Sequence, residues 1–427
     1  MTVAVFLVSL LGAMAIGMPV AFALIVCALA LMLHLDRFDS QIVAQNLIIG
    51  ADNFQLLAVP FFLLAGELMN AGGLSRRIVR VAVTLVGHVH GGLGYVAIFA
   101  AVVMASLSGS AAADTAALAS ILIPMMRDAG YNLPRSAGLI AAGGVIAPVI
   151  PPSIGFIIFG VAANVSITQL FLGGVFPGLL MGLSLVLAWA WVVRRDQVAV
   201  FPRASWGERL RAAVDGVWAL AMPVIILGGI KFGVVTPTEA AVLAAVYALF
   251  VGLFIYRELK PSQLYSVLLV AAKTTAVVMF LVASALVSAW LITQANIPAE
   301  LGGVLEPFRE HPKLLLLIMM LLVLVVGTAL DFAPTVLILT PVLMPVVKAA
   351  GIDPVYFGVL FIMNNAIGLL TPPVGIVLNV VCGVARLPMG AVIRGVMPFL
   401  LAQTVVLLLL VAFPELVTAP LKWLRGR

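Results

Sequence analysis

The sequence predicts an all-α polytopic membrane protein, from its composition, its recurrent apolar spans and an internal repeat. Of its 427 residues, 64% are hydrophobic and only 9% are charged, and the mean hydropathy is +1.24. A soluble domain carries about 25% charged residues, so no aqueous fold could bury this much apolar surface. The segments between the spans are short, which leaves no room for an ATPase module or a separate soluble domain.

The apolar spans follow one another along the whole chain. We predict them at 3–33, 56–68, 170–193, 217–230, 240–255, 273–292, 314–326 and 392–413. The stretch 35–52 is too polar to predict as a crossing, so the side of the N-terminus stays open. Because the first span lacks the basic region and cleavage site of a secretory signal, we expect it to be retained.

Basic residues gather at the ends of the spans and account for the net charge of +6. They form three groups: Arg76, Arg77 and Arg80; Arg194, Arg195, Arg203, Arg209 and Arg211; Arg257 and Lys260. Positive residues favour cytoplasmic loops, so all three groups are predicted to face the cytoplasm, and no nucleic-acid partner is needed to explain them. Cys27 and Cys382 lie far apart in apolar runs, which predicts neither a disulfide nor a metal cluster.

The chain contains an internal repeat with an offset of 220 or 221 residues. The matching pairs are Pro124–Gly130 with Pro345–Gly351, Val149–Gly155 with Leu370–Gly375, and Gly174–Pro177 with Gly395–Pro398. The sequence therefore divides into two halves, 1–200 and 205–427. Duplicated halves with proline-interrupted segments are typical of transporters whose binding site lies between the repeats near the middle of the bilayer.

Each half carries two interrupted apolar segments. The stretch 92–127 is broken at Ser106–Ser110, and 313–348 is broken at Gly327–Pro334, so each is predicted to form a re-entrant hairpin. A helix broken at a Pro-Pro pair follows each hairpin, at about 134–164 and about 354–385. Because irregular backbone at membrane depth is tolerated only where protein buries it or where it lines a cavity, we expect the four breaks to meet at one polar site.

Oxygen-bearing and small side chains cluster at these breaks. A coupling ion such as Na⁺ needs about five or six oxygens, which hydroxyls, amides and freed carbonyls can supply. The candidates are Ser106, Ser108, Ser110, Gly143 and Gly144 in the first half, and Thr328, Thr335, Asn364, Asn365 and Thr371 in the second. The alternative interpretation is that these residues only pack and hydrogen-bond neighbouring helices.

Acidic residues within apolar spans are candidate site residues. Asp331 lies at the second hairpin break, and Asp114 lies just beyond the first, where an N-cap role is the alternative. Glu67 is interpreted as structural, and Glu239 as part of a helix start. The half-helix N-termini after each break would favour an anionic organic substrate. No P-loop, HExxH or GxSxG motif occurs, so the sequence does not predict an enzyme.

Several spaced segments resemble one known family over essentially the whole chain. They are Pro60–Met69, Gly143–Ser153, Thr236–Ala241, Asp331–Pro341 and Asn364–Gly375. They are similar to the large membrane subunit of tripartite ATP-independent periplasmic (TRAP) transporters. The resemblance implies an elevator-type, Na⁺-coupled importer of an organic acid in the bacterial inner membrane. It also implies two partners, a small four-helix membrane subunit and a periplasmic substrate-binding protein.

The resemblance also assigns residues to sites. By motif match, the first Na⁺ site would contain Ser106, Ser108, Gly144 and Ile150, the second Gly327, Thr328, Asn365 and Thr371, and the substrate site Ser108, Ser153 and Asp331. Two other functions stay open: a stand-alone Na⁺-coupled carboxylate symporter of related hairpin architecture, and a channel or non-transporting scaffold. The sequence does not name the substrate, for which sialic acid, a C4-dicarboxylate, a keto acid and an aromatic acid all remain candidates.

Overall fold

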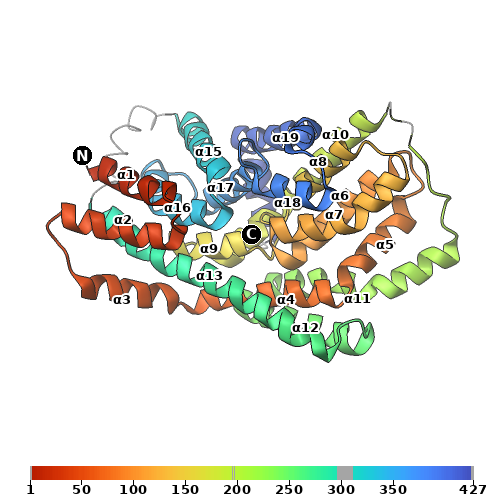
Figure 1. Ribbon diagram of the computed structural model, residues 1–427, viewed down its shortest axis with the longest axis horizontal. Helices are drawn as coiled ribbons and strands as arrows, with labels where there is room; N and C mark the ends of the chain where they lie inside the picture. The colour runs from red at the N-terminus through yellow and green to blue at the C-terminus, as the bar shows by residue number, and fades with distance from the viewer. Residues whose placement is uncertain (1, 195, 197, 296–310, 425–427) are drawn as a thin grey trace.

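The computed structural model describes residues 2–194, 196, 198–295 and 311–424, and the regular elements in these residues are all helices (Figure 1). The first half forms α1 (Thr2–Ala15), α2 (Val20–His34), α3 (Ser40–Ala51), the 3₁₀ helix η1 (Phe54–Leu57), α4 (Ala58–Ala71), α5 (Leu74–Val86), α6 (Gly92–Ser108), α7 (Ala111–Asp128), α8 (Leu133–Gly144), α9 (Ile154–Ala163) and α10 (Ile167–Val193).

The second half repeats much of this order. It forms α11 (Trp206–Lys231), α12 (Pro237–Phe250), the π-helical turn η2 (Val251–Ile255), α13 (Pro261–Gln294), α15 (Pro312–Ala329), α16 (Phe332–Ala349), α17 (Pro354–Gly368), α18 (Ile376–Ala385), α19 (Met389–Ala412) and α20 (Glu415–Leu424). The series α6 to α10 thus has a counterpart of the same order in α15 to α19.

The helices carry the spans that hydropathy predicts. Within the described residues, eight helical segments are long and apolar enough to cross a membrane: 54–71, 167–193, 206–231, 237–255, 261–294, 312–329, 332–349 and 389–412. Each overlaps a predicted span or an arm of a predicted hairpin. The prediction of a multi-pass helical membrane protein is confirmed.

The prediction of one span at 3–33 is wrong. The chain forms two helices there, α1 and α2, which pack against each other. Gly17 adopts φ +84°, a left-handed conformation that glycine tolerates without strain. Pro19 follows it and precedes α2 directly, and a proline has no N–H with which to continue a preceding helix. The N-terminal region therefore consists of two short packed helices.

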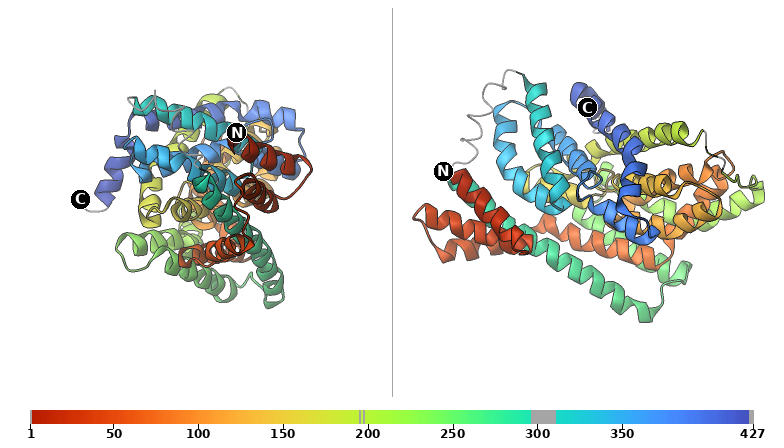
Figure 2. Two further views of the ribbon diagram at one scale, coloured as in Figure 1. Left: turned by 90° about the vertical axis from the view of Figure 1, so that its left-hand side faces the viewer. Right: turned by 45° about the horizontal axis from the view of Figure 1, so that its top comes forward.

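The helices form two groups. The outer group contains α1 to α5 and α11 to α13, in which α4 packs against α12 and the long α13 packs against α2, α3 and α4. The hairpin group contains α6 to α10 and α15 to α19, in which α8 and α10 pack against α19. In Figures 1 and 2, α12 and the first half of α13 lie on the opposite side of the molecule from α19. The groups meet where α13 contacts α16 and where α4 and α5 contact α6.

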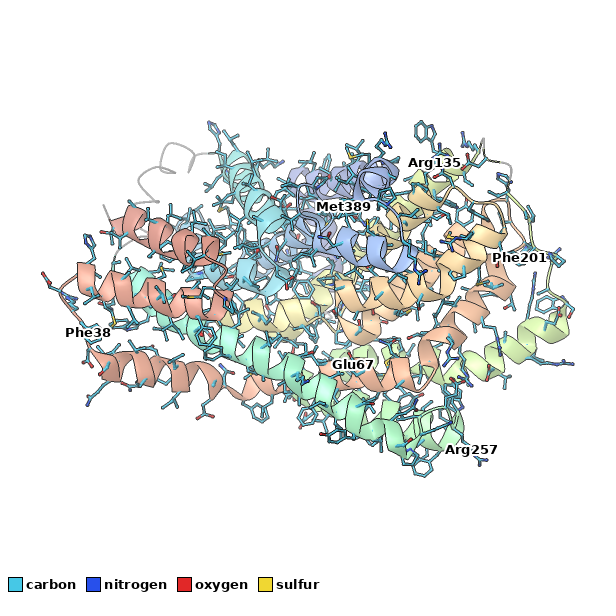
Figure 3. All side chains as sticks on the ribbon, viewed as in Figure 1. Phe38, Glu67, Arg135, Phe201, Arg257 and Met389 are labelled. Atoms are coloured by element: carbon cyan, nitrogen blue, oxygen red, sulfur yellow. The ribbon has the colours of Figure 1, made fainter. Side chains whose placement is uncertain are left out.

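Ion pairs hold the predicted cytoplasmic segments together. The Arg77 guanidinium lies 3.2 Å from the Asp215 carboxylate and 2.7 Å from the Glu258 carboxylate, and it stacks 3.6 Å from the centre of the Tyr256 ring. Burial raises the pKa of Tyr256 to about 12, so this phenol is neutral when it donates to the Asp215 carbonyl at 2.7 Å. Arg257, beside this cluster, lies at the same end of the molecule as Phe201 (Figure 3). The described residues of the three basic segments therefore lie on one side, in agreement with the prediction that all three face the cytoplasm; Arg195 lies outside the described residues.

The segment before the first hairpin and the helix after the second contact α10 towards its opposite ends. At the C-terminal end of α10, the Trp189 indole donates to the Gly91 carbonyl at 2.9 Å, just before α6 begins. In the N-terminal part of α10, Gly173 lies against Val355 and Val359 of α17, the helix that follows the second hairpin.

Alanine at Gly138 is expected to destabilise the fold, because the added methyl group would meet backbone atoms of Gly395 and Val396 where α8 crosses α19. Overpacking of this kind costs about 1–3 kcal/mol. Gly383→Ala is the matched control, since no described atom lies within 4 Å of its added methyl group and alanine gains up to about 1 kcal/mol of helix propensity. Thermal unfolding in detergent checks this, and equal melting temperatures for the two variants would contradict it.

Candidate functional site

The two hairpins break at equivalent positions. The helices α6 and α7 are separated by Gly109 and Ser110, and α15 and α16 by Leu330 and Asp331. Ser110 and Asp331 are both N-caps: the Ser110 hydroxyl accepts from the Ala113 N–H at 3.4 Å, and the Asp331 carboxylate accepts from the Phe332 N–H at 2.7 Å. These two caps are separated by 221 residues, the offset of the sequence repeat.

Each hairpin is followed by the broken helix that the sequence predicts. The first consists of α8 and α9 and the second of α17 and α18, and the observed bounds agree with the predicted ranges to within a residue. The breaks contain the Pro-Pro pairs Pro151–Pro152 and Pro372–Pro373, whose peptide bonds are cis. Gly109 of the first hairpin lies against the backbone of Pro152 and Ser153, so the hairpin tip touches the neighbouring break.

Residues at or next to all four breaks line one cavity of about 170 Å³. The cavity is lined by the first residues of α7, α9, α16 and α18, together with residues just before these helices and three from the outer group. The lining residues are Gly109, Ser110, Ala111, Ala112, Pro148, Ile154, Gly155, Ile158, Asp331, Phe332, Ala333, Leu369, Ile376 and Val377, with Leu63 of α4 and Thr274 and Val278 of α13.

The electrostatic character of the cavity comes mainly from the backbone. Four helix N-termini reach it, and each carries unpaired N–H groups and about half a positive charge. The polar side chains in the lining are those of Ser110, Thr274 and Asp331, so the walls are more apolar than the sequence suggests. A site of this kind favours an anion with an apolar or hydroxylated body.

Part of the first predicted Na⁺ set forms a buried polar cluster. The Ser108 hydroxyl donates to Asp114 Oδ1 at 2.5 Å and accepts from the Ser110 N–H at 3.1 Å. Asp114 is only 1% exposed, and its Oδ2 has no hydrogen-bond partner within the described residues. Thr115 Oγ1 is also buried without a hydrogen-bond partner among the described residues, and it lies against Gly144. The alternative N-cap role for Asp114 is wrong, because Ser110 caps α7.

The other two members of that set do not contribute side-chain oxygens to the cluster. The Ser106 hydroxyl donates to the Val103 carbonyl of its own helix at 2.6 Å. The Ile150 side chain packs against Gly178, so this residue can offer an ion only its backbone carbonyl. Thr115, which the sequence analysis missed, is the better side-chain candidate, and its position directly after Asp114 is the signal that could have found it.

The second predicted Na⁺ set centres on Asn365. Its amide nitrogen donates to the Phe332 carbonyl at 2.9 Å, and its Oδ1 is buried with no partner among the described residues. This oxygen lies against Gly327. The Thr328 hydroxyl donates to the Val325 carbonyl of its own helix, and the Thr371 hydroxyl donates to the Ile367 carbonyl of the preceding α17. Asn365 and Gly144 are also 221 residues apart, so the two sets occupy equivalent positions in the halves.

Two residues of the predicted substrate site, Ser153 and Asp331, differ from each other in their exposure. Ser153 is fully buried, caps α9 through the Phe156 N–H at 3.2 Å and donates to the Pro148 carbonyl at 2.5 Å, and it does not line the cavity. Asp331, by contrast, is exposed and lines it. Thr274 is a lining residue that the sequence analysis missed, although a polar group inside an apolar span could have revealed it.

The remaining acids have separate roles. Glu239 forms a capping box with Thr236, accepting from its N–H at 2.8 Å, which confirms its assignment to a helix start. Glu67 is half-buried on α4 in the central part of the molecule (Figure 3). Its neighbour Gly66 lies against Ser108, so α4 touches the first hairpin next to the Ser108–Asp114 pair.

The likeness to a solved structure concerns the fold. The crystal structure of the Alcanivorax borkumensis YdaH transporter matches with a TM-score of 0.61 and 16% sequence identity, over 88% of each chain. At this identity the match shows a shared fold and no more.

Comparisons of the sequence identify the family. The model for the tripartite ATP-independent periplasmic transporter, DctM component, matches residues 7–416. The 2,3-diketo-L-gulonate TRAP transporter large permease protein YiaN of Escherichia coli is 57% identical, over 99% of this chain and 100% of that protein. The sialic acid TRAP transporter large permease protein SiaM of Vibrio cholerae is 41% identical, over 95% of each chain. This chain therefore belongs to the DctM family of TRAP transporter large permeases, which are transport proteins and not enzymes.

Proposed function

We propose that this permease imports an organic acid across the bacterial inner membrane and couples the import to Na⁺. The observation that carries the proposal is the convergence of four helix N-termini on one cavity. A carboxylate placed there would accept hydrogen bonds from free N–H groups and lie at four positive dipole ends. The helix N-termini offer no comparable stabilisation to a neutral solute.

The substrate is proposed to be a hydroxylated acid. Asp331 lines the same cavity, and a second carboxylate beside it would be repelled unless a cation or a hydroxyl lay between them. A hydroxyl of the substrate can donate to Asp331 while its carboxylate faces the helix N-termini. The relative from Escherichia coli is named for 2,3-diketo-L-gulonate, an acid of this kind, which supports the choice.

The coupling ions are proposed to bind at the two buried clusters. Asp114 Oδ2, Thr115 Oγ1 and Asn365 Oδ1 are buried oxygens without partners among the described residues, and a buried oxygen without a partner costs about 1–3 kcal/mol. Na⁺ would satisfy them. Ser108 and Gly144 would complete the first site, and Gly327, Thr328 and Thr371 the second, with further ligands from backbone carbonyls at the breaks.

Transport is proposed to follow an elevator mechanism. In this mechanism the hairpin group moves as a rigid body against the outer group. The cavity then opens to one side of the membrane at a time, and α4 and α13 of the outer group form part of its wall. The contacts of Gly91 and of Val355 with opposite parts of α10 support re-entrant hairpins in two inverted repeats, 1–200 and 205–427. The limited contribution of the outer group to the cavity, from Leu63, Thr274 and Val278, supports movement along this boundary.

Two partners complete the proposed system. The family is named for a three-component, periplasmic system, so we propose a periplasmic protein that binds the acid and delivers it, and a small membrane subunit of four helices. The resemblance of the sequence to the family supports both. The stand-alone symporter is the second candidate, favoured by the fact that the cavity and both clusters lie within this one chain.

Uptake into proteoliposomes tests the proposal. The chain is reconstituted with the small subunit, and accumulation of labelled 2,3-diketo-L-gulonate, sialic acid and a C4-dicarboxylate is measured with and without an inward Na⁺ gradient and the binding protein. We expect concentrative uptake of one acid only when all components are present. Uptake without the binding protein would favour the stand-alone symporter, and flux that only equilibrates the acid would favour a channel.

A further inference from the structure

A second cavity lies far from the hairpin breaks, where α5 meets the start of α11. Its volume is about 700 Å³, and it is open to the surroundings. We call it the arginine pocket, because Arg80, Arg203 and Arg211 line it together with Thr84, Glu208 and Asp215. None of these residues belongs to the site proposed for the transported acid.

The two acids in the arginine pocket are already occupied by other groups. Asp215 pairs with Arg77 at 3.2 Å and with Arg80 at 3.4 Å. The Glu208 carboxylate accepts from the N–H and the hydroxyl of Ser205, at 2.7 and 2.9 Å, in a capping box. Arg203 and Arg211 have no ion-pair partner within the described residues. The pocket therefore offers a ligand two guanidinium groups without a salt bridge among the described residues, although the charge of Arg211 also acts on the nearby Glu208.

We expect the pocket to lie at the level of the lipid headgroups. It lies at the N-terminal end of α11, one of the segments long and apolar enough to cross a membrane. Trp206 at this end is 84% exposed and Leu210 is 66% exposed. Exposed tryptophan is typical of the interface between lipid and water. The basic residues of the segment place this end in the cytoplasmic leaflet, which is rich in anionic lipid.

We propose that the arginine pocket binds the headgroup of an anionic phospholipid of the cytoplasmic leaflet. Guanidinium groups bind phosphate oxygens through paired, charge-assisted hydrogen bonds, and Arg203 and Arg211 supply them here. Thr84 adds a hydroxyl to the pocket wall. The net positive charge of the pocket favours a lipid with a net negative headgroup over a zwitterionic one. Because α5 and α11 both belong to the outer group, the bound lipid would fasten that group to the membrane.

Lipid titration of the purified full-length protein, followed by native mass spectrometry, tests the proposal. The probes are dioctanoyl phosphatidylglycerol, dioctanoyl phosphatidylethanolamine and inorganic phosphate. We expect the wild type to retain phosphatidylglycerol preferentially, with inorganic phosphate unable to displace it. The double variant Arg203→Gln/Arg211→Gln should bind phosphatidylglycerol on the order of tenfold more weakly, since each basic residue near the surface adds to anionic-lipid affinity.

The matched control is Arg257→Gln/Lys260→Gln, which removes the same charge from the same side of the molecule but outside the pocket. It should bind phosphatidylglycerol as the wild type does. Equal losses in both double variants would indicate diffuse attraction and overturn the proposal, as would unchanged binding in Arg203→Gln/Arg211→Gln. Displacement by inorganic phosphate would assign the pocket to a soluble anion instead. If the glutamine variant does not fold, Arg203→Lys/Arg211→Lys, which keeps the charge but not the paired geometry, should show an intermediate loss.

Discussion

Asp331→Ala is expected to reduce uptake to the level of empty liposomes while leaving the fold and the assembly with partners intact. Asp331 caps α16 and lines the cavity where four helix N-termini converge. The substitution removes the carboxylate that is proposed to accept a hydrogen bond from a substrate hydroxyl. It also removes the only charged side chain among the described residues that line the cavity. Uptake of labelled acid measures the loss, and size-exclusion chromatography with the small subunit checks assembly.

Asp353→Ala is the matched control for this loss. Asp353 also caps a helix, accepting from the Tyr356 N–H at 2.8 Å at the start of α17, but it does not line the cavity where the breaks meet. Losing an N-cap costs about 0.5–2 kcal/mol, so both variants should be destabilised similarly, and only Asp331→Ala should stop transport. Full activity of Asp331→Ala would remove this residue from the substrate site.

The hairpins and broken helices could be predicted from the sequence because their interruptions are chemically distinct. Glycine, serine, aspartate and paired prolines stand out inside apolar runs, and the same interruption occurs twice at a constant offset. The loop between α1 and α2 has no second copy at that offset: its Met18–Val20 recurs only as Met222–Val224, 204 residues later and inside α11. Hydropathy alone therefore predicts one span across Gly17 and Pro19, although each of these residues disfavours a continuous helix.

Side-chain partners were harder to predict than helices. Sequence spacing does not distinguish Ser106, Ser108 and Ser110 as candidate ligands. In the structure, the hairpin turn gives each of the three hydroxyls a different hydrogen-bond partner. Ser106 bonds back to its own helix, Ser108 reaches Asp114, and Ser110 caps α7. The approach of Thr115 to Gly144 depends on how α7 packs against α8, which no local pattern encodes.

Ser108→Ala is expected to raise the Na⁺ concentration for half-maximal uptake on the order of tenfold. The hydroxyl of Ser108 donates to Asp114 and holds that buried carboxylate in place. A hydrogen bond to a charged group contributes about 1.5–3 kcal/mol, and about 1.4 kcal/mol corresponds to a tenfold change in affinity. The measurement is the initial rate of uptake as a function of Na⁺ concentration, at a saturating concentration of the acid.

Ser106→Ala separates this effect from a general loss of hairpin stability. Both serines lie in the last turn of α6, and both were assigned to the first Na⁺ site by motif. The Ser106 hydroxyl, however, bonds only to the Val103 carbonyl among the described residues, and its loss leaves no buried charge unsatisfied. We therefore expect Ser106→Ala to keep the wild-type Na⁺ dependence. If Ser106→Ala shifts the Na⁺ response and Ser108→Ala does not, the ion binds nearer to α6 than to Asp114, and the cluster of Ser108, Asp114 and Thr115 has only a structural role.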